Sequence, residues 1–117
     1  MASLETQQQF FSYNVSLLIA FIYDNDCSCT LGEAFRTVAQ AELYAKQGIG
    51  IRDSLHCDRL AIDLNIFSPH GYYWDDTEHY KIFGYYWKSL SPYNKWGGDF
   101  KKADGNHFEM SKSKKGI

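Results

Sequence analysis

Residues 5 to 23 place the strongest constraint on the fold, because this segment contains no glycine or proline and repeats apolar side chains every three to four positions. The repeat comprises Phe11, Val15, Leu18 and Ile22. Such spacing gives a helix one apolar face and predicts that the helix is well buried. The longest apolar run, residues 15 to 23, is shorter than the ~20 residues that span a bilayer, so we expect no membrane insertion.

The rest of the chain alternates between strand and helix patterns, with breaks at glycine, proline and short polar residues. We expect strands at 27–31, 60–67, 72–74 and 107–110, a short strand through 96–98, and helices from Thr37 to Lys46 and from Asp76 or Thr77 to about residue 90. Turns rather than helical crossovers join neighbouring strands. The pattern therefore predicts a small α+β domain with an antiparallel sheet and helices packed on it.

Composition limits the class of protein. At 117 residues, with 44% hydrophobic and 22% charged residues, the chain fits one globular domain over 1–117. A net charge of -2 argues against a protein built to bind nucleic acid, which needs many Lys and Arg side chains. The first residues lack the basic start of a secretory signal, so we expect synthesis in the cytoplasm without a signal peptide. We also expect a monomer with a flexible basic tail at 110–117, which is either a solvated end or a contact for an anionic polymer.

Cysteines and aromatic residues each allow two interpretations. Cys27, Cys29 and Cys57 are an odd number, so they provide no self-contained disulfide framework and indicate a reducing compartment. They are either small buried side chains or the ligands of a thiolate zinc site. The aromatic content of 17% exceeds what a core of this size needs, so residues such as Tyr72 and Trp96 either line a groove or pack in the core.

Two short segments, Ser54 to Asp63 and Asp104 to Glu109, concentrate the residues that can carry chemistry. They offer two imidazoles and a carboxylate, and three such ligands with water in a fourth position suit a catalytic zinc ion. His56 and Asp63 are seven positions apart, so an unbroken strand would point them to opposite faces. We therefore expect a loop or bulge at 58–59, followed by a strand that presents Asp63.

Asp104 precedes His107 by three residues, an offset that in a turn holds a carboxylate near the site without ligating the metal, as a general base requires. Glu109 follows His107 by two residues and would either orient its imidazole from outside the ligand set or act as the base itself. Taken alone, these residues also fit ordinary roles as a satisfied polar histidine, a strand carboxylate and a turn former.

Four motifs, in order, resemble the zinc D-alanyl-D-alanine peptidases, the family of VanX-like dipeptidases, VanY-like carboxypeptidases and phage L-alanyl-D-glutamate endolysins. Residues 54–63 are similar to the signature Ser-x-His-x-x-Gly-x-Ala-x-Asp, and residues 104–107 to the acid-x-x-His element. Trp-Gly-Gly at 96–98 and Phe-Arg-Thr with Gln40 at 35–40 match two further segments of the family. One position departs from the pattern, because Arg59 stands where the signature has glycine.

This resemblance implies a hedgehog/DD-peptidase-like fold with Zn2+ bound by His56, Asp63 and His107. It implies that Asp104 is the catalytic base and that Arg36 faces the substrate carbonyl.

The alternative for Arg36 is a structural ion pair with Glu33 or Glu42. Four further residues are predicted to contact the substrate, namely Ser54, Gln40, Trp96 and Tyr72.

The implied function is that of a zinc metallopeptidase that hydrolyses peptidoglycan stem peptides at the bacterial cell wall, as a phage-type endolysin that cuts the L-alanyl-D-glutamate bond. Two alternatives remain open. The chain could be a D-alanyl-D-alanine carboxypeptidase, or a non-catalytic zinc-containing binding module of the same fold, as the hedgehog signalling domain is generally regarded.

Overall fold

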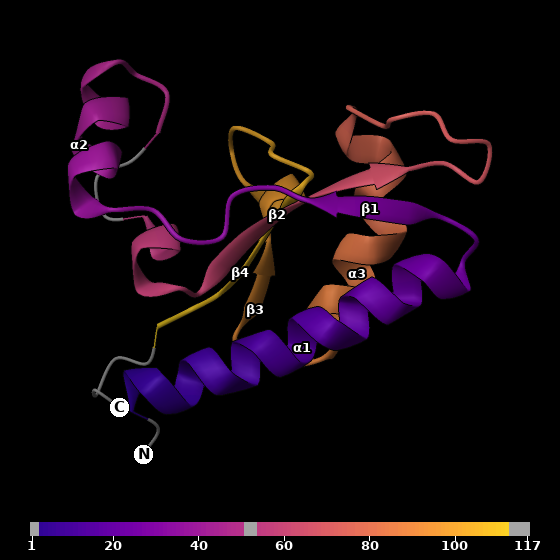
Figure 1. Ribbon diagram of the computed structural model, residues 1–117, viewed down its shortest axis with the longest axis horizontal. Coiled ribbons are helices and arrows are strands. Elements are labelled where there is room, and N and C mark those ends of the chain that lie inside the picture. Colours follow the sequence, from indigo (N-terminus) through magenta and orange to yellow (C-terminus); the bar gives the residue numbers. More distant parts are fainter. Residues whose placement is uncertain (1–2, 51–53, 113–117) are drawn as a thin grey trace.

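A computed structural model describes residues 3–50 and 54–112 (Figure 1). Its helices are α1 (Leu4–Asp24), α2 (Val38–Lys46) and α3 (Lys81–Ser89), and short 3-10 turns lie at Leu55–Asp58, Thr77–Tyr80 and Gly97–Asp99. Its strands are β1 (Ser28–Leu31), β2 (Ala61–Phe67), β3 (Asn94–Trp96) and β4 (His107–Met110). They form a four-stranded antiparallel sheet in the order β1-β2-β4-β3, which confirms the predicted α+β architecture.

The predicted amphipathic helix is α1, which runs beside the sheet and contacts both α3 and β1 (Figure 1). It begins where the Ser3 hydroxyl accepts a hydrogen bond from the Thr6 N–H at 3.1 Å, an N-cap that satisfies one of the free donors of the first turn. All four residues of the apolar repeat are buried in the core.

β2 has one face in the core and the other face toward the candidate site. Ile62, Leu64 and Ile66 join the core side chains of α1 and α3, whereas Asp63 and Asn65 lie on the opposite face of the strand because side chains alternate. The strand therefore presents a carboxylate outside the core while its neighbours anchor it by burial.

The predicted strand at 72–74 is largely absent and survives as an isolated bridge between Phe67 and Tyr73. The physical reason is a hydroxyl inserted between the two segments. The buried Tyr80 hydroxyl accepts from the Ile66 N–H at 3.0 Å and donates to the Trp74 carbonyl at 2.7 Å, so it replaces one direct bond of the ladder. Burial raises the pKa of this Tyr80 hydroxyl to about 12.

The short strand expected through 96–98 lies instead at β3, because the chain turns at Gly97–Asp99 into a 3-10 turn. The remaining predicted elements lie close to where the sequence places them, with differences at their ends. The third helix begins as the 3-10 turn at Thr77–Tyr80 and becomes α-helical only at α3. The strand expected at 107–110 is β4, so Met110 ends a strand and does not begin the flexible tail, and the Ser111 N–H donates to the Tyr93 carbonyl at 2.8 Å. The remainder of the predicted tail, from residue 113, lies outside the described residues.

No helix within residues 3–50 and 54–112 is long and apolar enough to cross a membrane. No disulfide joins Cys27, Cys29 and Cys57, all of which lie in the described residues. Cys27 is buried, and this burial raises the pKa of its thiol. Cys27 belongs to the core and Cys29 packs against it, as small buried side chains do. In the described part of the chain, no group of residues that could hold a metal ion includes a cysteine.

Candidate metal centre

Three separate elements bring His56, Asp63 and His107 together. Asp63 is the third residue of β2, and His107 opens β4 directly opposite it in the register of the sheet. His56 lies on the 3-10 turn before β2, and that turn is capped by Ser54, whose hydroxyl accepts from the His56 N–H at 3.1 Å. The sheet therefore fixes two of the residues and a capped turn fixes the third.

Their potential ligand atoms all lie within 4.8 Å of one another. His56 Nε2 lies 3.4 Å from Asp63 Oδ1, and His107 Nδ1 lies 3.2 Å from the same oxygen. The two imidazole rings are 5.0 Å apart at their centroids and inclined at 70°. Both histidines are buried and Asp63 is half-buried, so the three groups converge at the edge of the protein interior.

The outward nitrogen of each imidazole is also engaged. His56 Nδ1 lies 3.2 Å from the Ala34 carbonyl oxygen, and His107 Nε2 lies 2.7 Å from Glu109 Oε1. Metal-binding histidines characteristically give their other ring N–H to a carbonyl or carboxylate, which fixes the tautomer and the ring orientation. Glu109 therefore occupies the position of a residue that orients His107.

These contacts perturb the protonation of the cluster. Burial favours the neutral form of Asp63, but hydrogen bonds from His107 and His56 outweigh it and lower the pKa of this carboxyl to about 2. Burial likewise disfavours charge on His107, but hydrogen bonds to Asp63 and Glu109 raise the pKa of its imidazole to about 9. The carboxylates of Asp63 and Glu109 thus stabilise positive charge at His107.

The segment from Gly32 to Arg36 holds His56 and Asp63 in place. The Gly32 N–H donates to the Asp63 carbonyl at 2.7 Å, and the Asp63 N–H donates to the Glu33 carbonyl at 2.9 Å. The Arg36 N–H donates to the His56 carbonyl at 3.2 Å. This segment supports the two residues through its backbone. A backbone carbonyl such as that of Ala34 cannot be identified from the sequence, because every residue has one.

Arg36 forms one of the two ion pairs considered from the sequence. Its guanidinium forms an ion pair with Glu33, with Nε 2.9 Å from Oε1, and it lies over the Tyr44 ring at 5.1 Å. Glu33 Oε1 is in turn 3.9 Å from His56 Nε2. Arg36 therefore lies beside the cluster, held by a carboxylate that the sequence suggested only as one of two possible partners.

Asp104 lies in the loop that leads into β4. The Asp104 N–H donates to the Gly97 carbonyl at 2.9 Å, and its own carbonyl accepts from the His107 N–H at 3.1 Å, which forms the turn expected from the spacing. A side chain at Gly97 would collide with the Asp104 carbonyl and approach His107 Cβ to 2.8 Å, so only glycine fits there. The pKa of the Asp104 carboxyl is raised, first by partial burial and then by the charge of Asp63.

The four predicted substrate contacts have different surroundings. Ser54 is buried and caps the turn that carries His56. Gln40 is half-buried in the first turn of α2. Tyr72 is 72% exposed.

The structure places Trp96 in the core instead of a groove. Trp96 is only 2% exposed, its ring packs against Gly84 and Gly98, and its indole N–H donates to the Gly105 carbonyl at 2.7 Å.

Arg59, the departure from the family signature, adopts a left-handed backbone conformation with φ 55° and ψ 37° at the end of the 3-10 turn. This is the loop expected between His56 and Asp63, and it allows the chain to turn into β2. A left-handed conformation costs a residue other than glycine about 1–2 kcal/mol, which explains in physical terms why glycine suits this position.

The donor set suits a divalent metal of the zinc type. Two imidazole nitrogens and one carboxylate oxygen form a common three-residue set for catalytic zinc, which leaves further coordination positions open. The outward nitrogens are already hydrogen-bonded, so the rings are oriented to present their inner nitrogens. His56, Asp63 and His107 could therefore hold such an ion.

Comparison with known proteins finds a similar fold in a solved structure. The chain is similar to the crystal structure of Serratia marcescens L-Ala D-Glu endopeptidase ChiX, with a TM-score of 0.74 and 17% sequence identity over 99% of this chain and 92% of that one. No protein-family model matches the sequence, and no curated protein does so either. At this identity, the similarity establishes that the chain shares the fold of an L-Ala D-Glu endopeptidase.

Proposed function

We propose that this protein is a zinc-dependent peptidase that hydrolyses the stem peptides of bacterial peptidoglycan. The observation that carries the proposal is the convergence of His56, Asp63 and His107 within 4.8 Å, in a fold shared with an L-Ala D-Glu endopeptidase. A zinc ion in such a site supplies a Lewis acid and makes water nucleophilic near neutral pH.

The surrounding residues have distinct roles in this proposal. Asp104, outside the ligand group but within the electrostatic field of Asp63 and His107, accepts the proton of the attacking water and passes it to the leaving amine. Its raised pKa favours that exchange, because a general base works best when its pKa approaches the working pH. Arg36 stabilises negative charge on the carbonyl oxygen once the substrate competes with Glu33 for its guanidinium.

For the bond that is cut, we propose the L-alanyl-D-glutamate linkage, in the manner of a phage-type endolysin acting at the cell wall. A D-alanyl-D-alanine carboxypeptidase would use the same chemistry but release a single terminal residue. Tyr72 is exposed enough to contact the stem peptide, and Gln40 is partly accessible.

The test is digestion of purified peptidoglycan by the zinc-loaded protein, with the products identified by mass spectrometry. Release of stem peptides that begin with glutamate would support the endopeptidase, and release of alanine alone would support the carboxypeptidase. Asp104→Ala should keep zinc but lower turnover by about 100-fold or more, as expected for loss of a general base.

His70→Ala is the matched control, because His70 is an exposed histidine outside the cluster and its loss should change neither zinc content nor turnover. Bound zinc with no activity on any peptidoglycan type would refute the peptidase and favour a zinc-containing binding module.

A further inference from the structure

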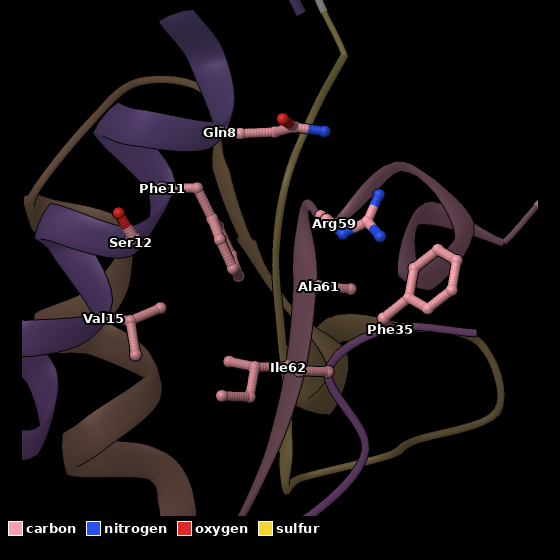
Figure 2. Close-up of a pocket in the computed structure, with 9 residues that line it drawn as sticks. Gln8, Phe11, Ser12, Val15, Phe35, Arg59, Ala61 and Ile62 are labelled. Atoms are coloured by element: carbon pink, nitrogen blue, oxygen red, sulfur yellow. The ribbon is translucent and has the colours of Figure 1, made fainter. Parts of the chain in front are cut away.

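A hollow lies between the first half of α1, the start of β2 and the loop before α2. Its volume is about 370 Å3, within the range of pockets that bind small molecules. In Figure 2, side chains of α1 lie on one side of this hollow, and Phe35 and Arg59 lie on the other. Its lining comprises Gln8, Phe11, Ser12, Val15, Ala34, Phe35, Arg59, Ala61 and Ile62.

Most of this lining is hydrocarbon, since six of the nine residues are apolar. Two of the three polar residues are bound to the backbone. The Gln8 side-chain amide donates to the Asp58 carbonyl at 2.8 Å, and the Ser12 hydroxyl donates to the Gln9 carbonyl at 3.0 Å. The wall therefore offers few groups for the amides of a peptide, and it suits an apolar ligand body.

Arg59 is the one charged residue of the lining. Its guanidinium lies over the Phe35 ring, with Cζ 4.0 Å from the ring centroid. Within residues 3–50 and 54–112, no carboxylate forms an ion pair with Arg59. This side chain is also carried by a left-handed backbone, a conformation that glycine would adopt without strain. Arg59 thus places a long cationic side chain beside an apolar hollow, although its backbone conformation is unfavourable for a residue other than glycine.

We propose that this hollow is a binding site for an acyl carboxylate, a ligand with an unbranched hydrocarbon chain and one terminal carboxylate. The chain lies against Phe11, Val15 and Ile62, and the carboxylate pairs with Arg59. A single guanidinium balances one negative charge, and its planar fork matches the two oxygens of a carboxylate.

The proposed site adjoins the candidate metal centre without being part of it. Ala34 lines the hollow, and its carbonyl oxygen lies 3.2 Å from His56 Nδ1. The proposal does not depend on the peptidase function, because it concerns different side chains and a different ligand.

The experiment is a titration of the full-length protein with octanoate, followed by heteronuclear NMR. We expect saturable 1:1 binding, with shifts concentrated at the amides of Phe35, Arg59 and Ile62. Octan-1-ol and octylamine carry the same chain without negative charge, and each should bind at least about tenfold more weakly than octanoate, since the charge-assisted contact is lost.

Two variants locate the ligand. Arg59→Gln keeps the length of the side chain but removes its charge, and it should weaken octanoate binding by about tenfold or more. Lys101→Gln removes one exposed charge outside the pocket and should have no effect.

Ser12→Phe narrows the hollow from α1 and should also weaken binding by about tenfold or more. Ser16→Phe is its matched control, because Ser16 is exposed on the same helix, makes the same kind of bond to the carbonyl three residues earlier, and does not line the pocket.

The proposal is overturned if the folded protein does not bind octanoate, if octan-1-ol binds as tightly, or if Arg59→Gln and Ser12→Phe bind like the unmodified chain. Tighter binding of N-acetyl-leucine than of octanoate would instead assign the site to a peptide terminus. Self-association that Ser12→Phe abolishes would assign it to a second copy of the chain.

Discussion

Removal of the Tyr80 hydroxyl should lower the stability of the fold. Tyr80 is 1% exposed, and its hydroxyl joins the Ile66 N–H to the Trp74 carbonyl. Tyr80→Phe keeps the ring but removes this link, so two backbone groups in the interior lose a hydrogen-bonding partner.

An unsatisfied buried group costs about 1–3 kcal/mol, and partial relaxation of the segment around Trp74 recovers some of that cost. We therefore expect Tyr80→Phe to lower the free energy of unfolding by about 2–3 kcal/mol. In a domain of this size, such a loss lowers Tm by roughly 10 °C.

The assay is urea unfolding followed by circular dichroism, with thermal unfolding as a second measurement. Tyr85→Phe is the matched control, because Tyr85 lies on α3, is 55% exposed, and has no hydroxyl hydrogen bond within the described residues. Its free energy of unfolding should change by less than about 0.5 kcal/mol. If both variants are equally stable, the Tyr80 hydroxyl does not hold these segments together and the explanation for the missing strand is wrong.

Three further predictions concern the candidate metal centre. Gly97→Ala should lower both stability and zinc affinity, because the added methyl group collides with the Asp104 carbonyl and crowds His107. Calorimetry should show a Kd for zinc that is weaker by at least about tenfold. Gly50→Ala is the control, because its methyl group meets only ordinary contacts and should leave the Kd unchanged. Glu109→Ala should weaken zinc binding by about 10–100-fold by freeing the His107 ring, and an unchanged Kd would remove Glu109 from the support of the site. The His107 pKa of about 9 means that its imidazole is protonated at pH 7 in the metal-free protein, so zinc must displace a proton. Apparent zinc affinity, measured by chelator competition, should therefore rise with pH by about tenfold per unit from pH 7 to 9, and a flat profile would contradict this protonation.

Much of the architecture follows from local patterns in the sequence. The apolar period of α1, the capping role of Thr37 at α2 and the apolar run of β2 specify their elements, because each pattern has one favourable way to bury its apolar face. The strand expected at 72–74 failed because the hydroxyl that interrupts it comes from Tyr80, six residues beyond the segment, and competes with a direct backbone bond.

The site was predictable where side-chain identity carries the chemistry. His56, Asp63 and His107 lie together as the motifs suggested, with a left-handed turn at Arg59 between the first two. The supporting contact from the Ala34 carbonyl was not predictable, because every residue has a backbone carbonyl and only the fold decides which one faces the histidine.

Trp96 was ambiguous for a different reason. An aromatic residue beside two glycines suits either a groove wall or a core position. The structure places Trp96 in the core, because Gly84, on the preceding helix α3, leaves room for the indole ring.

The proposed function requires that two imidazoles and one aspartate bind a single zinc ion. X-ray absorption spectroscopy at the zinc edge, on protein loaded with one equivalent of zinc, tests it most directly. We expect nitrogen and oxygen ligands at about 2.0–2.2 Å with the scattering of two imidazoles, reduced to one imidazole in His107→Ala. Sulfur ligands at about 2.3 Å, or a spectrum that His107→Ala leaves unchanged, would contradict it.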